Sequence, residues 1–163
     1  MEYAIIRCRG RDTLPLVMGL LEYDVEAWSP LVRQRVRVAR KRKVIEKIRP
    51  AMPSFVFVHR SDLGKCLWLG GRRIVPSHTT FKMNGEVVFV PERELEPLRS
   101  LEDQSRQASP SLPVGAKVEI VSGPFKEMRG AVVASNDDYL MVHLEDFLWN
   151  LKLAPFLVRP IRL

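Results

Sequence analysis

The spacing of apolar residues predicts a strand followed by a helix at the start of the chain. Residues 3–9 (YAIIRCR) are mostly apolar and end at a glycine, as is typical of a strand. Helical spacing then places Leu14, Val17, Met18 and Leu21 in one apolar stripe. We expect this stripe to pack on a sheet.

Two extended segments follow, joined by a polar tip. Residues 25–38 are strand-like with an interruption near Ser29-Pro30, and the apolar pattern resumes at Val44 after the tip. Residues 54–58 (SFVFV) then give the strongest strand signal in the chain. Because side chains alternate along a strand, Phe55 and Phe57 share one face, and the pattern leaves open whether that face meets the core or a partner.

The second half of the chain changes from mixed to β character. The predicted elements are a helix over 62–69, a hairpin turn at Asn84-Gly85 within strand-like residues 75–90, and a helix from 91 that carries Leu95, Leu98 and Leu101. Residues 104–113 are polar and rich in proline, which is typical of a linker. Four or five short strands follow, near 117–121, 130–135, 140–144 and 149–153, and this density fits a small barrel better than a sandwich.

Positive charge is concentrated in one stretch. Residues 33–49 contain nine Lys or Arg against one acid, a local net charge of +8, whereas the whole chain carries +7. We therefore expect a polyanionic partner at a two-stranded arm formed by these residues. Arginine forks bind phosphates bidentately, so backbone contact is expected rather than sequence readout. The alternative is a hairpin tip that its charges merely keep soluble. The candidate nucleic-acid-binding residues are Arg33, Arg35, Arg37, Arg40, Lys41, Arg42 and Lys43.

Composition limits the class of protein to which the chain can belong. With 46% hydrophobic and 28% charged residues, the chain has the balance of a soluble globular protein. It has no apolar run long enough to cross a bilayer, and no secretion signal is seen at its start. Both observations favour a cytoplasmic protein with no membrane partner. Cys8 and Cys66 are expected to be buried free thiols. The histidines are scattered with no plausible Cys or Ser partner, so no metal, no cofactor and no enzymatic activity are expected.

Two motifs resemble those of a known family. Residues 114–133 (VGAKVEIVSGPFKEMRGAVV) resemble a KOW motif in its NusG form, in which Gly123 and Gly130 bracket a tight loop between strands. Residues 52–58 (MPSFVFV) resemble the FPGYVFV signature of the NusG N-terminal domain, which likewise follows a basic hairpin. The order and spacing agree over nearly the whole chain. The residues of the KOW loop are Gly123, Pro124, Phe125 and Gly130.

The resemblance implies an α+β fold with two domains. The expected parts are an N-terminal α/β sandwich over 1–103, with an antiparallel sheet flanked by helices, a linker over 104–113, and an SH3-like β-barrel, the KOW domain, over 114–163. The implied function is that of a monomeric transcription elongation factor that sits on the clamp helices of RNA polymerase and modulates pausing and termination, with processive antitermination as the expected outcome. The implied polymerase-binding residues are Tyr3, Met52, Pro53, Phe55 and Phe57.

The resemblance also implies further partners. The arm would reach DNA of the transcription bubble or the upstream duplex, and the KOW domain would recruit Rho, a ribosomal protein or another Nus factor. The family pattern is broken at Met52, at Ser54 where glycine is usual, and at Glu145-Asp146-Phe147 where Phe-Gly-Arg is usual. These departures point to a specialised paralogue or a phage-borne relative.

Two alternatives remain open. A ribosome-associated RNA-binding KOW protein would use the same arm, although the balanced charge of residues 114–163 is unlike the basic KOW domain usual there. A factor of the RfaH type would refold its C-terminal half into helices. Phe147, Trp149 and Leu151 alternate at strand period and Pro155 breaks a helix, which argues against such refolding.

Overall fold

The computed structural model describes residues 1–38, 40, 43–103, 105–107, 112–136, 138–147 and 149–161. It divides into two compact units, each made of two chain segments. The first contains Met1–Pro30 and Met52–Glu96, and the second contains Leu31–Ala51 and Pro97–Leu163. The two-stranded arm therefore belongs to the same unit as the C-terminal strands. The domain boundaries expected from sequence remain a prediction.

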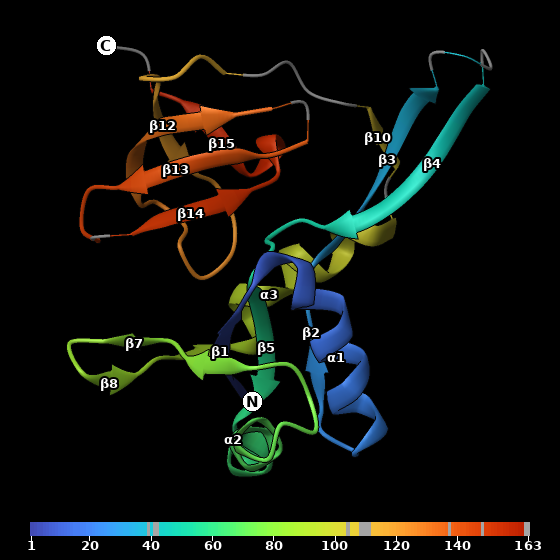
Figure 1. The fold of residues 1–163 in the computed structure, drawn as a ribbon. Helices are drawn as coiled ribbons and strands as arrows, with labels where there is room; N and C mark the ends of the chain where they lie inside the picture. Colours follow the sequence, from blue (N-terminus) through green and yellow to red (C-terminus); the bar gives the residue numbers. More distant parts are fainter. Residues whose placement is uncertain are drawn as a thin grey trace. The chain divides into compact units, whose positions relative to one another are not determined.

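The first unit is built on an antiparallel sheet (Figure 1). Its strand order is β2-β5-β1-β6, and β9 also pairs with β1. The strands are β1 (Glu2–Cys8), β2 (Ala27–Trp28), β5 (Phe55–His59), β6 (His78–Thr80) and β9 (Phe89–Pro91). The predicted strands at 3–9 and 54–58 are confirmed.

Helices α1 (Thr13–Glu22) and α2 (Leu63–Gly71) cover one face of this sheet. The core between them is formed by buried aliphatic and thiol side chains: Ile6, Leu16, Leu20, Val56, Val58, Cys66, Leu69 and Val75. No helix in the described part of the chain has the length and apolar content needed for a bilayer crossing, and α1, with ten residues, is the longest of them.

The predicted stripe on α1 is wrong. Met18 and Leu21 are 66% and 52% exposed, and the fully buried positions are Thr13, Leu16 and Leu20. The hydroxyl of Thr13 donates to the carbonyl of Gly10 and accepts the N–H of Ser54, at 2.7 and 2.8 Å. These bonds hold Thr13 in the core and set which side of the helix faces the sheet.

The remaining predicted elements of the first unit are present. Strands β7 (Lys82–Met83) and β8 (Glu86–Val87) form a hairpin whose turn residues, Asn84 and Gly85, both have positive φ (51° and 80°). Helix α3 (Glu92–Arg99) begins in this unit and leads into a 3₁₀ turn (Ser100–Asp103). The predicted helix from 91 is present, and Leu95 and Leu98 in it and Leu101 in the following turn are buried.

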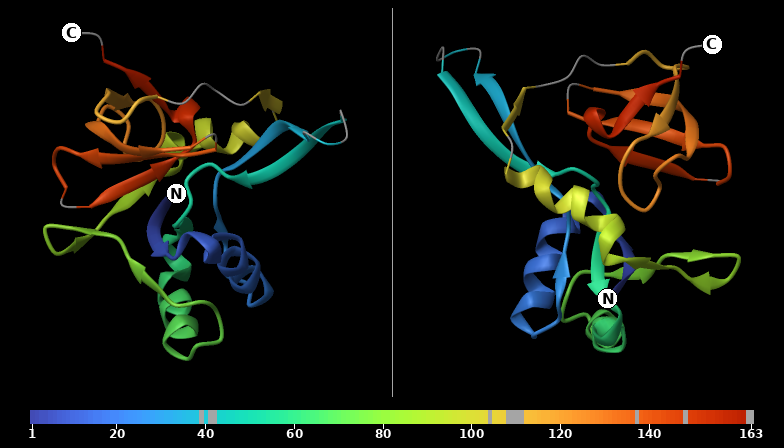
Figure 2. Two further views of the ribbon diagram at one scale, coloured as in Figure 1. Left: turned by 45° about the horizontal axis from the view of Figure 1, so that its top comes forward. Right: turned by 180° about the vertical axis from the view of Figure 1, so that it is seen from behind.

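The arm of the second unit consists of β3 (Leu31–Val38) and β4 (Lys43–Pro50), paired antiparallel. Strand β10 (Ser105–Gln107) adds to the other edge of β3 in parallel orientation. Figure 2 shows the arm as a long ribbon with β10 alongside β3. Part of the predicted linker is thus a strand, because the open edge of β3 offers backbone groups that need partners.

The C-terminal residues form a five-stranded antiparallel sheet of order β14-β13-β12-β11-β15 (Figure 1). Its strands are β11 (Lys117–Ile120), β12 (Arg129–Ser135), β13 (Leu140–Leu144), β14 (Asn150–Leu153) and, after a 3₁₀ turn (Pro155–Leu157), β15 (Val158–Pro160). The four predicted strands are confirmed, and β15 is the fifth. Whether this sheet is the expected SH3-like barrel remains a prediction.

Candidate nucleic-acid interface

The register of the arm determines which charged residues share a face. Arg33, Arg35 and Arg37 alternate along β3, and they lie opposite Ile48, Glu46 and Val44 of β4, respectively. Residues that are directly opposite in an antiparallel pair project to the same side. Arg33 and Arg35 therefore follow one face, as predicted, and both are exposed.

The other face of the arm is also basic, which the sequence pattern did not show. Lys43, Lys47 and Arg49 lie opposite Val38, Gln34 and Val32. Lys43 and Lys47 are exposed, whereas Val32 and Gln34 are buried. Cations therefore line both faces of the arm, with Glu46 as the one acid of the two strands. Among the other candidates, Arg40 is exposed, while Lys41, Arg42 and the side chain of Arg37 lie outside the described residues.

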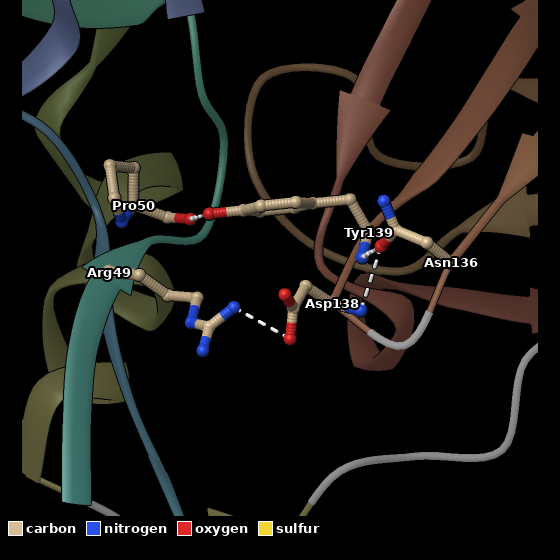
Figure 3. Close-up of polar contacts among 5 residues, drawn as sticks. All are labelled: Arg49, Pro50, Asn136, Asp138 and Tyr139. Carbon is tan, nitrogen blue, oxygen red and sulfur yellow. Dashed lines mark hydrogen bonds and ion pairs between the residues drawn. The ribbon is translucent and has the colours of Figure 1, made fainter. Parts of the chain in front are cut away.

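The base of the arm is joined to the C-terminal sheet by an ion pair (Figure 3). Arg49 Nη1 lies 2.6 Å from Asp138 Oδ1, and the Arg49 side chain is only 16% exposed. The loop that carries Asp138 connects β12 to β13. Its shape depends on Asn136, whose Oδ1 accepts the backbone N–H of both Asp138 and Tyr139 at 2.8 Å.

Two further hydrogen bonds hold the same region. The Tyr139 hydroxyl donates to the carbonyl of Pro50 at 3.1 Å (Figure 3), and the N–H of Ala154 donates to the carbonyl of Ala51 at 2.9 Å. Burial raises the pKa of Tyr139 above its ordinary value, so the hydroxyl keeps its proton for this bond. The last residues of the arm are thus bonded to the C-terminal sheet and the loop between β12 and β13.

The predicted polymerase-binding residues lie inside the chain rather than on its surface. Tyr3, Met52, Phe55 and Phe57 are at most 2% exposed, and Pro53 is buried as well. The polymerase-binding role implied for Phe55 and Phe57 would have them face a partner rather than the core, and in this structure they do not face outward. Both faces of β5 are buried, since Val56 and Val58 on the opposite side are also fully covered. The role of these residues toward RNA polymerase remains a prediction.

Three of them nevertheless share one face of the first sheet. The register pairs Tyr3 with His59 and Ile5 with Phe57, so Tyr3, Phe55 and Phe57 project to the same side. Trp28 of β2 lies between two of them, with ring centroids 6.4 Å from Tyr3 and 5.0 Å from Phe57. Sequence reasoning missed Trp28, because it stands next to the interruption at Ser29-Pro30 and only sheet pairing brings it beside β5.

The loop predicted from the KOW resemblance has a geometry that requires glycine at two positions. Gly123 has a φ of +90°, which side chains other than glycine rarely adopt. A Cβ on Gly130 would collide with the backbone carbonyl of His143 on the paired strand β13. Phe125 is buried and packs edge-on against Trp149, with ring centroids 6.1 Å apart. This loop is a structural element of the C-terminal sheet.

One histidine does have a cysteine partner, contrary to the sequence-based expectation. Cys66 Sγ lies 3.4 Å from His78 Nε2, and His78 Nδ1 lies 2.9 Å from the carbonyl of Pro76. Because the Nδ1–H donates a hydrogen bond to the carbonyl of Pro76, Nε2 is the acceptor of a hydrogen bond from the Cys66 thiol. Burial raises the pKa of Cys66 to about 12, so the sulfur is not a nucleophile near neutral pH. Cys8 is half-buried, and among the described residues there is no cluster suited to a metal ion.

Comparison with known proteins leaves the family open. No protein-family model and no curated protein matches the sequence. Three solved structures align with almost the whole chain. They are the MjSpt4:Spt5 complex in conformation B (17% identity, TM-score 0.32, covering 100% of this chain and 98% of that one), the same complex in conformation A (17%, 0.29, 99% and 98%) and Thermotoga maritima NusG in a structure of its domain interaction (18%, 0.37, 99% and 97%). Such low identities and TM-scores do not assign the chain to a family.

Proposed function

We propose that this chain is a transcription elongation factor that contacts nucleic acid at the transcription bubble through the arm. The observation that carries the proposal is the distribution of charge on β3 and β4. Exposed Arg33 and Arg35 follow one face, exposed Lys43 and Lys47 follow the other, and Glu46 is the one acid. Such an arm attracts the phosphates of a nucleic acid whichever of its two faces meets them.

The contact would be made to the phosphate backbone and would not read sequence. Arginine and lysine on a strand present point charges and forks that neutralise phosphates. By staying on the polymerase and holding DNA at the fork, the factor would disfavour pausing. Transcripts would then be longer, and the polymerase would read through terminators, which is antitermination. The two motifs that resemble the NusG family, at residues 52–58 and 114–133, support the choice of transcription over other nucleic-acid processes.

The polymerase contact is proposed to use the face that carries Tyr3, Phe55 and Phe57, together with Met52 and Pro53. Because these side chains are buried, binding through them requires that this face be uncovered first. We place the clamp helices of RNA polymerase there on the strength of the motif resemblance. By the same resemblance, the C-terminal sheet, as a KOW domain, is proposed to recruit a second protein.

The test is a pausing and terminator read-through assay with purified RNA polymerase. The arm variant carries Arg33→Gln, Lys43→Gln and Lys47→Gln, all at exposed positions. The control variant removes the same charge elsewhere, at exposed Lys82, Lys117 and Lys126. We expect the wild type and the control to lengthen transcripts and the arm variant to lose most of this effect. Circular dichroism and thermal melting verify that all three proteins fold.

A second candidate function is binding to structured ribosomal RNA. The observation that favours it is the charge on both faces of the arm, which suits insertion between two phosphate backbones. If the wild type has no effect on polymerase and does not bind it, yet binds ribosomal RNA in a strongly salt-dependent way, this candidate replaces the first. Equal loss of read-through in the arm and control variants would contradict a specific role of the arm.

A further inference from the structure

The outward face of α2 in the first unit combines an exposed tryptophan with exposed cations. Cys66 and Leu69 face the core and are fully buried, whereas Trp68 is 54% exposed. Lys65 and Arg72 stand three residues before and four residues after Trp68, on the same side of the helix, and both are exposed. A large aromatic surface flanked by cations is thus presented to solvent.

The helix residues of this surface are basic, and apolar side chains are exposed next to them. The stretch 63–74 (LGKCLWLGGRRI) contains three cations and no acid. In the described part of the chain, Lys65, Arg72 and Arg73 make no ion pair. The Arg72 guanidinium lies over the Trp68 ring, 5.4 Å from its centroid. Leu67, next to Trp68 in sequence, and Ile74, just after the end of the helix, are each 42% exposed.

Arg73 occupies a backbone position that favours glycine. The N–H of Arg73 donates to the carbonyl of Gly70 and the N–H of Ile74 to that of Leu69, both at 3.1 Å, which closes α2 in a Schellman-type turn. The residue at this turn adopts a φ of +58°. Glycine is usual here because a Cβ is disfavoured at positive φ. An arginine at this position adds backbone strain, and among the described residues it has no ion-pair partner. This combination indicates that the Arg73 side chain contacts a partner molecule.

We propose that the outward face of α2 binds an acid-rich segment of a partner protein that carries an apolar anchor side chain. The carboxylates would meet Lys65, Arg72 and Arg73, and the anchor would rest on Trp68 between Leu67 and Ile74. A nucleic-acid base can stack on Trp68, but the exposed aliphatic side chains of Leu67 and Ile74 suit an apolar protein anchor better. A second copy of this face would bring like charges together.

The experiment is a peptide titration of the isotope-labelled full chain, with NMR as the readout. The probe is a synthetic peptide rich in Asp and Glu with a central Leu-Phe pair, and the reference peptide has Lys in place of each acid. Substitution of Trp68 by Phe assigns its indole N–H signal. We expect the acidic peptide to shift that signal and the amides of residues 63–74, and the basic peptide to shift neither.

Arg73→Gly separates binding from folding. Glycine relieves the positive φ, so the melting temperature should stay the same or rise, while loss of a charge-assisted contact should weaken peptide binding by about tenfold or more. Trp68→Ala should weaken binding similarly, and Lys82→Gln, an exposed charge elsewhere in this unit, should not. An oligo-dT probe reports separately on the arm, so failure here and failure of the proposed function are distinguishable.

Three results would overturn the proposal. The first is the absence of binding by the acidic peptide. The second is peptide-induced shifts confined to residues 31–50, which would mean that acids simply seek the most basic part of the chain. The third is loss of oligo-dT binding in Trp68→Ala with peptide binding intact, which would assign this face to nucleic acid.

Discussion

The guanidinium of Arg49 and the carboxylate of Asp138 lie 2.6 Å apart, and they join the base of the arm to the loop between β12 and β13. Arg49 is the cation at the base of the arm, and it is only 16% exposed. Its positive charge is already engaged by an acid of the same unit. If the arm binds nucleic acid as proposed, this carboxylate competes with phosphates for Arg49.

Replacing Asp138 by Asn is expected to strengthen nucleic-acid binding. The change frees Arg49, and because Asp138 is 43% exposed the gain should be modest, about fivefold at most. One more neutralised phosphate should steepen the logarithmic salt dependence of single-strand affinity by about 0.7. Fluorescence anisotropy with oligo-dT at several salt concentrations measures both. Asp146→Asn is the matched control, and an equal gain in the control would attribute the effect to net charge alone.

Replacing Ser54 by Gly is expected to stabilise the chain. Ser54 has a φ of +82°, and its backbone is held there by the N–H of Cys8 on its carbonyl and by Thr13 on its own N–H. Glycine removes the Cβ strain of that conformation, which is about 1 kcal/mol or more. Urea unfolding measures the difference. Ser54→Ala keeps the strain and should give no gain, so equal stabilisation by both substitutions would contradict this explanation.

Replacing Gly130 by Ala is expected to destabilise the C-terminal sheet strongly. The new Cβ meets the backbone carbonyl of His143, which cannot move without breaking the β12–β13 pairing. We expect a loss of about 3 kcal/mol or more. Gly64→Ala is the control, because no atom lies within 4 Å of its added Cβ and a helical alanine is favoured over glycine. Thermal unfolding of the two variants should move in opposite directions.

The stability of the chain is expected to fall at alkaline pH through Cys66. Its pKa is raised from 9.0 to about 12, so between these values the unfolded chain releases a proton that the folded chain retains. The free energy of unfolding should therefore decrease as pH rises above 9, by about 1.4 kcal/mol per pH unit from this group. Denaturation of wild type and Cys66→Ala at several pH values isolates the contribution. Parallel pH dependences in the two proteins would contradict it.

The same burial predicts a slow thiol reaction. At pH 8 a disulfide reagent should modify Cys66 only as fast as the native structure opens, because the sulfur is fully covered and protonated. Adding denaturant should make the reaction rapid. Rapid modification of Cys66 in the native protein, located by mass spectrometry, would show that the thiol is accessible.

The sequence by itself determined the elements with strong local signals. Asn84-Gly85 predicted a hairpin turn because both residues accept positive φ, and both have it. The pattern from residue 91 predicted a helix carrying Leu95, Leu98 and Leu101, and α3 begins at Glu92. The strand-like pattern that ends at residue 38 and resumes at Val44 likewise predicted the two strands of the arm.

Only the tertiary structure decided which faces are buried and which side chains meet. A strand pattern cannot tell that both sides of Phe55–His59 are covered, because burial depends on what packs against each face of the sheet. The side of α1 that meets the sheet followed from two hydrogen bonds of Thr13, which join segments far apart in sequence. The pairs Arg49–Asp138 and Cys66–His78 arise in the same way, from chain segments that folding alone brings together.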